Sequence, residues 1–129
     1  MRLLLLVILC LSANAVLSAE QEVPTDVVFP QKLTAAELRV YCAASAISAT
    51  GRQRQRYCDG FLSGMEEGIR VLGLISGNKG VATLCVPASV SAREMRAAFV
   101  KHSAALNPPT DKPAVRYAIE VLEKAYPCQ

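Results

Sequence analysis

The sequence predicts an all-α fold, a small four-helix domain stapled by two disulfides. Apolar residues recur at alternating steps of three and four over several segments, which is the period of helices that bury one face. Two capping-box patterns, at residues 34–37 and 91–94, mark helix starts. Four cysteines remain after an N-terminal export leader: Cys42, Cys58, Cys85 and Cys128. A domain of this size gains useful stability from disulfides, which persist in an oxidising compartment.

The first nineteen residues have the composition of an export signal. Arg2 provides a short positive start, residues 3–11 are continuously apolar, and small residues follow. Cleavage could fall after Ala15 or a few residues later, near Ala19, and we interpret residues 1–19 as a signal peptide. The apolar run of roughly ten residues is about half of what a membrane-spanning helix needs. We therefore expect a periplasmic protein with no membrane span after leader cleavage.

Loss of the leader removes Arg2 and no acidic residue, which leaves 13 basic and 11 acidic residues and a net charge of +2. This near balance, together with the absence of tryptophan, argues against a nucleic-acid partner. Residues 20–33 contain two prolines and no helical period, which indicates a flexible N-terminal arm. Residues 34–129 are then expected to form one domain.

Two helices are expected before the long central loop. The first should run from the Thr34 cap to about Thr50 and be closed by Gly51 as a C′ glycine. Its predicted apolar face comprises Leu38, Tyr41, Cys42, Ser45 and Ala49. The second should run from about Arg54 to Ile75. It carries the strongest apolar stripe in the chain, formed by Cys58, Leu62, Met65, Ile69 and Leu72.

Three glycines follow one another at four-residue spacing within the second predicted helix: Gly60, Gly64 and Gly68. Each glycine in a helix interior costs roughly 1 kcal/mol relative to alanine. We interpret the row as a place where a neighbouring backbone of the fold approaches closely. The alternative is a surface for a partner, and charged residues beside the row exclude a membrane-spanning helix.

The second half of the chain predicts a turn and crossover loop over residues 76–87, followed by two more helices. The third helix should start after Ser91 and stop at residues 107–109. Its apolar face comprises Met95, Ala98, Phe99, His102 and Leu106. The fourth should be capped by Thr110 or Asp111, with Pro113 in its first turn. Its inward face is expected to contain Val115, Ala118, Ile119, Leu122 and Ala125.

The helix order favours one pairing of the cysteines. Cys42 lies nine residues before Gly51 and Cys58 lies seven after it, so antiparallel packing of the first two helices brings both to similar heights. Cys85 precedes the third helix and Cys128 follows the fourth, and an antiparallel pair places these ends together. We therefore expect Cys42–Cys58 and Cys85–Cys128, although four cysteines allow three pairings.

Catalytic and metal-binding signatures are absent from the sequence. His102 is the sole histidine, and its helical neighbours are apolar, so no carboxylate is placed to orient it. The cysteines have neither the spacing of a thioredoxin-type motif nor that of covalent haem attachment. There is no nucleophile elbow, phosphate loop or calcium loop. We expect no enzyme activity, no metal and no other cofactor.

Three arginines, Arg52, Arg54 and Arg56, alternate with glutamines near the expected start of the second helix, where positive charge opposes the helix macrodipole. We interpret them as a solvated helix entrance. The alternative is a basic contact patch for an acidic partner.

Three motifs in order resemble the Rap/Tai family of immunity proteins over residues 34–128. They are YCDGFLSGM at residues 57–65, CVP at residues 85–87 and AYPC at residues 125–128. Members of that family look like YCxGYxxG, a later CxP and a closing FPC, with Phe61 and Tyr126 here in the aromatic places. Glu67 stands where the family often has aspartate, which is a conservative departure.

The resemblance implies that the protein protects a bacterium from type VI secretion effectors reaching the periplasm, chiefly peptidoglycan amidases. Protection would come from binding the toxin and blocking its active-site cleft, and family members also form homodimers. Recognition is expected on exposed loops and the arginine segment. The candidates are Arg52, Arg54, Arg56, Asn78, Lys79, Thr110, Asp111 and Lys112.

Two alternatives remain open at the level of the sequence. One is a small periplasmic acid-stress chaperone, which would expose apolar surface at low pH and bind many unfolded clients. The 11 acidic residues and the single histidine form no obvious buried titrating cluster, which weighs against such a switch. The other is an orphan envelope interaction protein that keeps the immunity scaffold without a cognate toxin.

Overall fold

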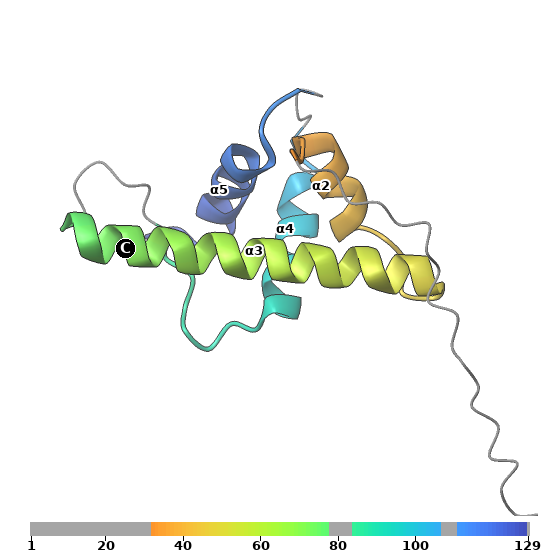
Figure 1. Ribbon diagram of the computed structural model, residues 1–129, viewed down its shortest axis with the longest axis horizontal. Coiled ribbons are helices and arrows are strands. Elements are labelled where there is room, and N and C mark those ends of the chain that lie inside the picture. The colour runs from red at the N-terminus through yellow and green to blue at the C-terminus, as the bar shows by residue number, and fades with distance from the viewer. Residues whose placement is uncertain (1–31, 78–83, 107–110, 129) are drawn as a thin grey trace, which may run out of the picture.

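The described part of the chain is an all-α domain, as predicted. The structure, a computed structural model, describes residues 32–77, 84–106 and 111–128. These ranges contain four helices and no strand: α2 (Ala35–Cys42), α3 (Ala49–Ser76), α4 (Ala92–Ser103) and α5 (Ala114–Ala125). Helix α3 has 28 residues and is about 42 Å long. It spans the long axis of the domain, α2 and α4 pack against it, and α5 packs against α2 and α4 (Figure 1).

The boundary between the first two helices differs from the prediction. Helix α2 ends at Cys42 instead of continuing to Thr50, and α3 begins at Ala49 instead of about Arg54. Ser48 is the N-cap of α3, and its hydroxyl accepts a 3.0 Å hydrogen bond from the backbone amide of Gly51. Gly51 is therefore not a C′ glycine but a buried residue in the first turn of α3.

Gly51 is required at this position by a close approach of the preceding loop. A Cβ atom built on Gly51 would lie 1.7 Å from the carbonyl oxygen of Ser45. The loop is also fastened to α3 by Gln55, whose Nε2 donates a 2.6 Å hydrogen bond to the carbonyl of Ala44. The sequence contains a glycine here because the loop folds back onto the start of α3.

The capping boxes of α2 and α4 form as predicted. Ser91 Oγ accepts a 3.3 Å hydrogen bond from the Glu94 amide, and the Glu94 carboxylate accepts a 2.8 Å bond from the Ser91 amide. Thr34 and Glu37 form the same reciprocal pair at the start of α2. These two helix starts depend on four adjacent residues each, which is why the local sequence predicts them.

Helix α5 begins in a different way from the prediction. Pro113 is its N-cap instead of a first-turn residue, and no side chain caps it, so Asp111 does not have the predicted role. Thr110 lies outside the described residues. Backbone groups at the start of α2 take over the capping, since Ala114 donates a 3.0 Å hydrogen bond to the carbonyl of Leu33. In return Ala35 donates to the carbonyl of Lys112 over 2.8 Å.

The hydrophobic core lies among α2, α4, α5 and the middle of α3. Its fully buried members are Ala35, Leu38, Cys42, Cys58, Leu62, Met95, Phe99, Ala114, Tyr117, Ala118, Val121 and Leu122. Phe99 and Tyr117 pack edge to face with ring centroids 5.8 Å apart, and burial raises the pKa of the Tyr117 phenol. Burial likewise raises the pKa of Tyr126, which packs against the edge of the core.

Some predicted core positions face outward instead. Val115 of α5 is 47% exposed, while Tyr117 and Val121, which the predicted inward face omitted, are buried. Leu72, the last member of the predicted α3 stripe, is 56% exposed. Helix α3 is longer than the helices that pack against it, so its stripe is covered at Cys58 and Leu62 but not at its C-terminal end.

Both expected disulfides are present. Cys42 and Cys58 join α2 to α3 in the core, with Cα atoms 5.1 Å apart. Cys85 and Cys128 join the segment before α4 to the segment after α5, with Cα atoms 5.2 Å apart and both residues exposed. The two bridges therefore fasten one hairpin each, one inside the core and the other at the surface.

Candidate functional site: a basic pocket between two helices

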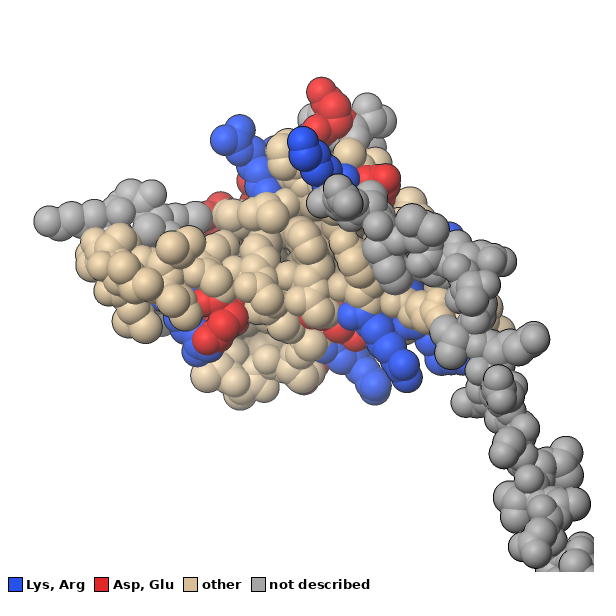
Figure 2. Space-filling model, viewed as in Figure 1, with Lys and Arg blue, Asp and Glu red and all other residues tan. Residues whose placement is uncertain are grey.

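A pocket of about 510 Å³ opens between the N-terminal half of α3 and the start of α4. It is lined by Ala46, Arg52, Gln55, Arg56, Asp59, Arg93 and Arg96. Four arginines against one aspartate give the lining a net charge of three positive units. Figure 2 shows basic side chains gathered on this side of the domain, below the N-terminal half of α3.

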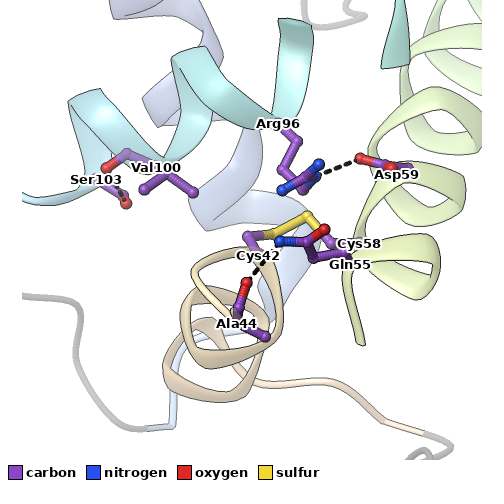
Figure 3. Close-up of a disulfide and its surroundings, with 8 residues drawn as sticks. All are labelled: Cys42, Ala44, Gln55, Cys58, Asp59, Arg96, Val100 and Ser103. Atoms are coloured by element: carbon purple, nitrogen blue, oxygen red, sulfur yellow. Dashed lines mark hydrogen bonds and ion pairs between the residues drawn. A yellow bond between two sulfur atoms is a disulfide. The ribbon is translucent and has the colours of Figure 1, made fainter. Parts of the chain in front are cut away.

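Two of the arginines are held in place by hydrogen bonds. Arg96 of α4 donates a 2.7 Å bond from Nε to Oδ1 of Asp59 in α3, and their side chains are only 15% and 26% exposed (Figure 3). Arg52 donates from Nη1 to the carbonyls of Ala46 and Ile47, each over 3.1 Å. These contacts fix two edges of the pocket before any partner binds.

The other two arginines are available for a ligand. Arg56 and Arg93 are exposed, and neither has a hydrogen-bond or ion-pair partner among the described residues. Glu94 is next to Arg93 in sequence, but its carboxylate binds the hydroxyl and amide of Ser91, which lowers the pKa of Glu94. The positive potential of the pocket is therefore balanced within its lining by Asp59 alone.

Helical spacing explains why these side chains share one face. Arg52, Arg56 and Asp59 recur at steps of four and three along α3. Arg93 and Arg96 are three residues apart on α4. This second pair cannot be connected with the first from the sequence, because only the packing of α4 on α3 brings the two pairs together. The usable signal was the three-residue spacing of two arginines in the first turns of α4.

Arg54, the middle arginine of the predicted patch, belongs to a different surface. Its guanidinium lies over the ring of Tyr41, 5.8 Å from the centroid, and the Tyr41 and Tyr57 rings pack edge to face at 5.5 Å. The Nε atom of Arg54 is buried without a hydrogen-bond partner. The structure therefore separates Arg54, which packs on an aromatic pair, from Arg52 and Arg56, which line the pocket.

Of the remaining predicted contact residues, the two that the structure describes, Asp111 and Lys112, do not line this pocket. Asn78, Lys79 and Thr110 lie outside the described residues. Asp111 is exposed and lines a separate pocket of about 460 Å³, whose wall includes Tyr57 and Phe61 of α3. Lys112 forms an ion pair with Glu120 of α5. Lys112 is thus engaged within the fold.

The glycine row of α3 is exposed, contrary to the interpretation that a neighbouring backbone packs closely on it. A Cβ atom built on Gly60, Gly64 or Gly68 would meet no atom within 4 Å. Farther along α3 several apolar residues are exposed, including Leu74 at 78% and Ile75 at 79% exposure. The face of α3 that carries these residues is therefore open among the described residues, although Gly73 on the same helix is buried.

The described residues contain no group of three or more His, Cys, Asp or Glu residues that could hold a metal ion. Within the same ranges, no helix combines the length and the apolar composition that crossing a membrane requires. His102 is half-buried on α4.

The fold and the pocket define a class: small all-α proteins that are stapled by disulfides and carry a basic pocket. The model of the family described as Rap1a immunity proteins matches residues 34–128, and the chain belongs to that family. The resemblance predicted from the three motifs is thus confirmed. Comparison with curated proteins and with solved structures gives no significant match.

Proposed function

We propose that this protein is a periplasmic immunity protein that binds and inhibits a type VI secretion effector, specifically a peptidoglycan amidase. The observation that carries the proposal is the family match over residues 34–128. The predicted leader of residues 1–19 and the two disulfides support an oxidising compartment outside the cytoplasm. A peptidoglycan-degrading toxin acts in that compartment, so the inhibitor and its target would meet there.

Inhibition would depend on binding and not on catalysis. Disulfides and capping boxes hold the helices of the free protein in place, so little conformational entropy is lost when a partner docks. A folded domain seated over a substrate cleft excludes substrate without any reaction of its own. The protein then needs neither a cofactor nor a metal, and one molecule would block one toxin.

An affinity experiment tests this function. The mature, oxidised protein is immobilised at neutral pH, exposed to periplasmic extract, and the retained proteins are identified by mass spectrometry. We expect one secreted peptidoglycan hydrolase, whose amidase activity is inhibited at a one-to-one ratio. Recovery of many unrelated proteins, or of none until the pH is lowered, would contradict the proposal and favour an acid-stress chaperone.

Self-association into a homodimer is a further part of the proposal, since the resemblance implies it. Light scattering coupled to size-exclusion chromatography measures the mass directly. We expect twice the mass of the mature chain at micromolar concentration. A monomer at every accessible concentration would remove this part and leave toxin binding unaffected.

A further inference from the structure

We propose that the basic pocket between α3 and α4 receives a carboxylate-bearing segment of the toxin. The inference rests on the proposed function, because it takes the occupant to be the inhibited protein. It adds the chemistry of the contact and the residues that make it: Arg52, Arg56, Arg93 and Arg96. Two of these, Arg93 and Arg96, belong to a helix that the sequence did not connect with binding.

The type of cation indicates the type of ligand. All the basic residues of the lining are arginines. A guanidinium offers planar, paired N–H donors that match the two oxygens of a carboxylate, whereas a lysine ammonium acts as a compact point charge. Arg56 and Arg93 have no partners among the described residues, so their donors can form such paired bonds. The pocket therefore fits an Asp or Glu side chain of the partner.

The placement of the arginines is unfavourable for the protein alone. Arg52 lies in the second turn of α3 and Arg93 in the first turn of α4, where both helix macrodipoles are positive. Like charges on facing helices also repel one another. An anionic partner removes both penalties when it binds, and the concentrated positive potential accelerates its association.

The pocket is preorganised by the core beneath it. Cys58 is bridged to Cys42 and is followed directly by Asp59, which pairs with Arg96 (Figure 3). Gln55, one turn earlier, is bonded to Ala44 in the loop that also anchors Arg52. Asp59 is thus a positioning residue, since it fixes the Arg96 guanidinium at the inner edge of the lining.

The test uses the full protein with both disulfides formed and the toxin recovered in the affinity experiment. Titration calorimetry compares the wild type with Arg56→Glu/Arg93→Glu and with Lys124→Glu, which alters an exposed residue of α5 outside the pocket. We expect the double reversal to weaken toxin binding roughly a hundredfold. The control should change it less than about threefold. Thermal melting of each variant confirms that it is folded, and Arg56→Gln/Arg93→Gln should give an intermediate loss.

A cross-linking experiment identifies the chemistry of the occupant. Arg56→Lys/Arg93→Lys keeps the charge and supplies amines, which a carbodiimide joins only to carboxylates in direct contact. Mass spectrometry should find an amide link from position 56 or 93 to an Asp or Glu of the toxin. If this variant binds the toxin as the wild type does and no such link forms, the carboxylate contact is wrong.

The possible outcomes of these experiments distinguish failure of the pocket proposal from failure of the proposed immunity function. Unchanged toxin binding by the double reversal overturns the pocket and leaves the immunity function in place. The double reversal changes the net charge by four units and Lys124→Glu by two, so a loss of binding free energy in Lys124→Glu of about half that in the double reversal shows general charge attraction and also overturns the pocket proposal. A wild-type protein that retains no secreted toxin contradicts the proposed function itself, and with it the protein occupant of the pocket.

Discussion

Arg96 of α4 donates a 2.7 Å hydrogen bond to Asp59 of α3, directly beside the residue through which α3 is bridged to α2. Two adjacent positions of α3, Cys58 and Asp59, therefore connect it to two different helices. The disulfide lies in the core, and the ion pair lines the basic pocket. Stability and the geometry of the proposed contact surface are coupled at this point.

We predict that Asp59→Ala lowers the free energy of unfolding by about 1–2 kcal/mol, because the mostly buried Arg96 loses its charged acceptor. Urea denaturation measures the change. A double-mutant cycle with Arg96→Ala should give a coupling energy of about 0.5–2 kcal/mol. Strictly additive effects would show that the pair contributes no interaction energy.

Substitution by alanine should change the free energy of unfolding in opposite directions at two glycines of α3, Gly51 and Gly60. Gly51→Ala places a methyl group on the Ser45 carbonyl, so we predict a loss of more than about 2 kcal/mol in the free energy of unfolding. Gly60→Ala is the matched control, because the new methyl group meets nothing, and it should stabilise the protein by about 0.5–1 kcal/mol. Thermal and urea melts report both. Equal effects at the two positions would contradict the close loop approach at Gly51.

The sequence predicts the elements whose causes are local. The capping boxes at Thr34 and Ser91 each need four consecutive residues, and both helices begin there. The cysteine pairing also followed from helix order, because each bridge closes one helical hairpin. Features of this kind depend little on how the remaining chain packs.

The predictions that were wrong concern features that depend on tertiary contacts and not on the local sequence. Gly51 has the local character of a helix end, but the returning loop at Ser45 makes it a buried first-turn residue. The glycine row and Leu72 have the spacing of a packed face, yet the shorter helices do not reach them. The basic pocket needs arginines from two helices, and the sequence shows only the first set together.

The two disulfides should differ in accessibility to a reductant. Cys85 and Cys128 are exposed, whereas Cys42 and Cys58 are buried, so mild dithiothreitol should reduce Cys85–Cys128 first in the folded protein. Mass spectrometry after alkylation identifies the reduced pair. Earlier reduction of the buried pair would indicate local opening between α2 and α3.

Replacing both cysteines of a pair by alanine should lower the free energy of unfolding by about 3 kcal/mol for Cys42–Cys58 and by about 4 kcal/mol for Cys85–Cys128.

The capping boxes should make stability depend on pH in the acid range. Hydrogen bonds from the backbone amide of Thr34 and, to a smaller extent, from its hydroxyl lower the pKa of Glu37. Hydrogen bonds from the hydroxyl of Ser91 and, to a smaller extent, from its backbone amide lower the pKa of Glu94. Each carboxyl thus binds its proton less readily in the folded state than in the unfolded state, where glutamate has a pKa of about 4.3.

The sign of the effect follows from this difference. Stabilisation by the two carboxylates is complete above the unfolded pKa and is lost as the pH falls through the lower folded value. We predict that Glu37→Gln/Glu94→Gln is less stable than the wild type at neutral pH and loses less stability below a pH of about 4.3. Urea denaturation across this range measures both slopes, with Glu123→Gln, an exposed residue outside either capping box, as the control. Parallel curves for the double variant and the wild type would show that the two capping boxes do not contribute to the acid sensitivity of the fold.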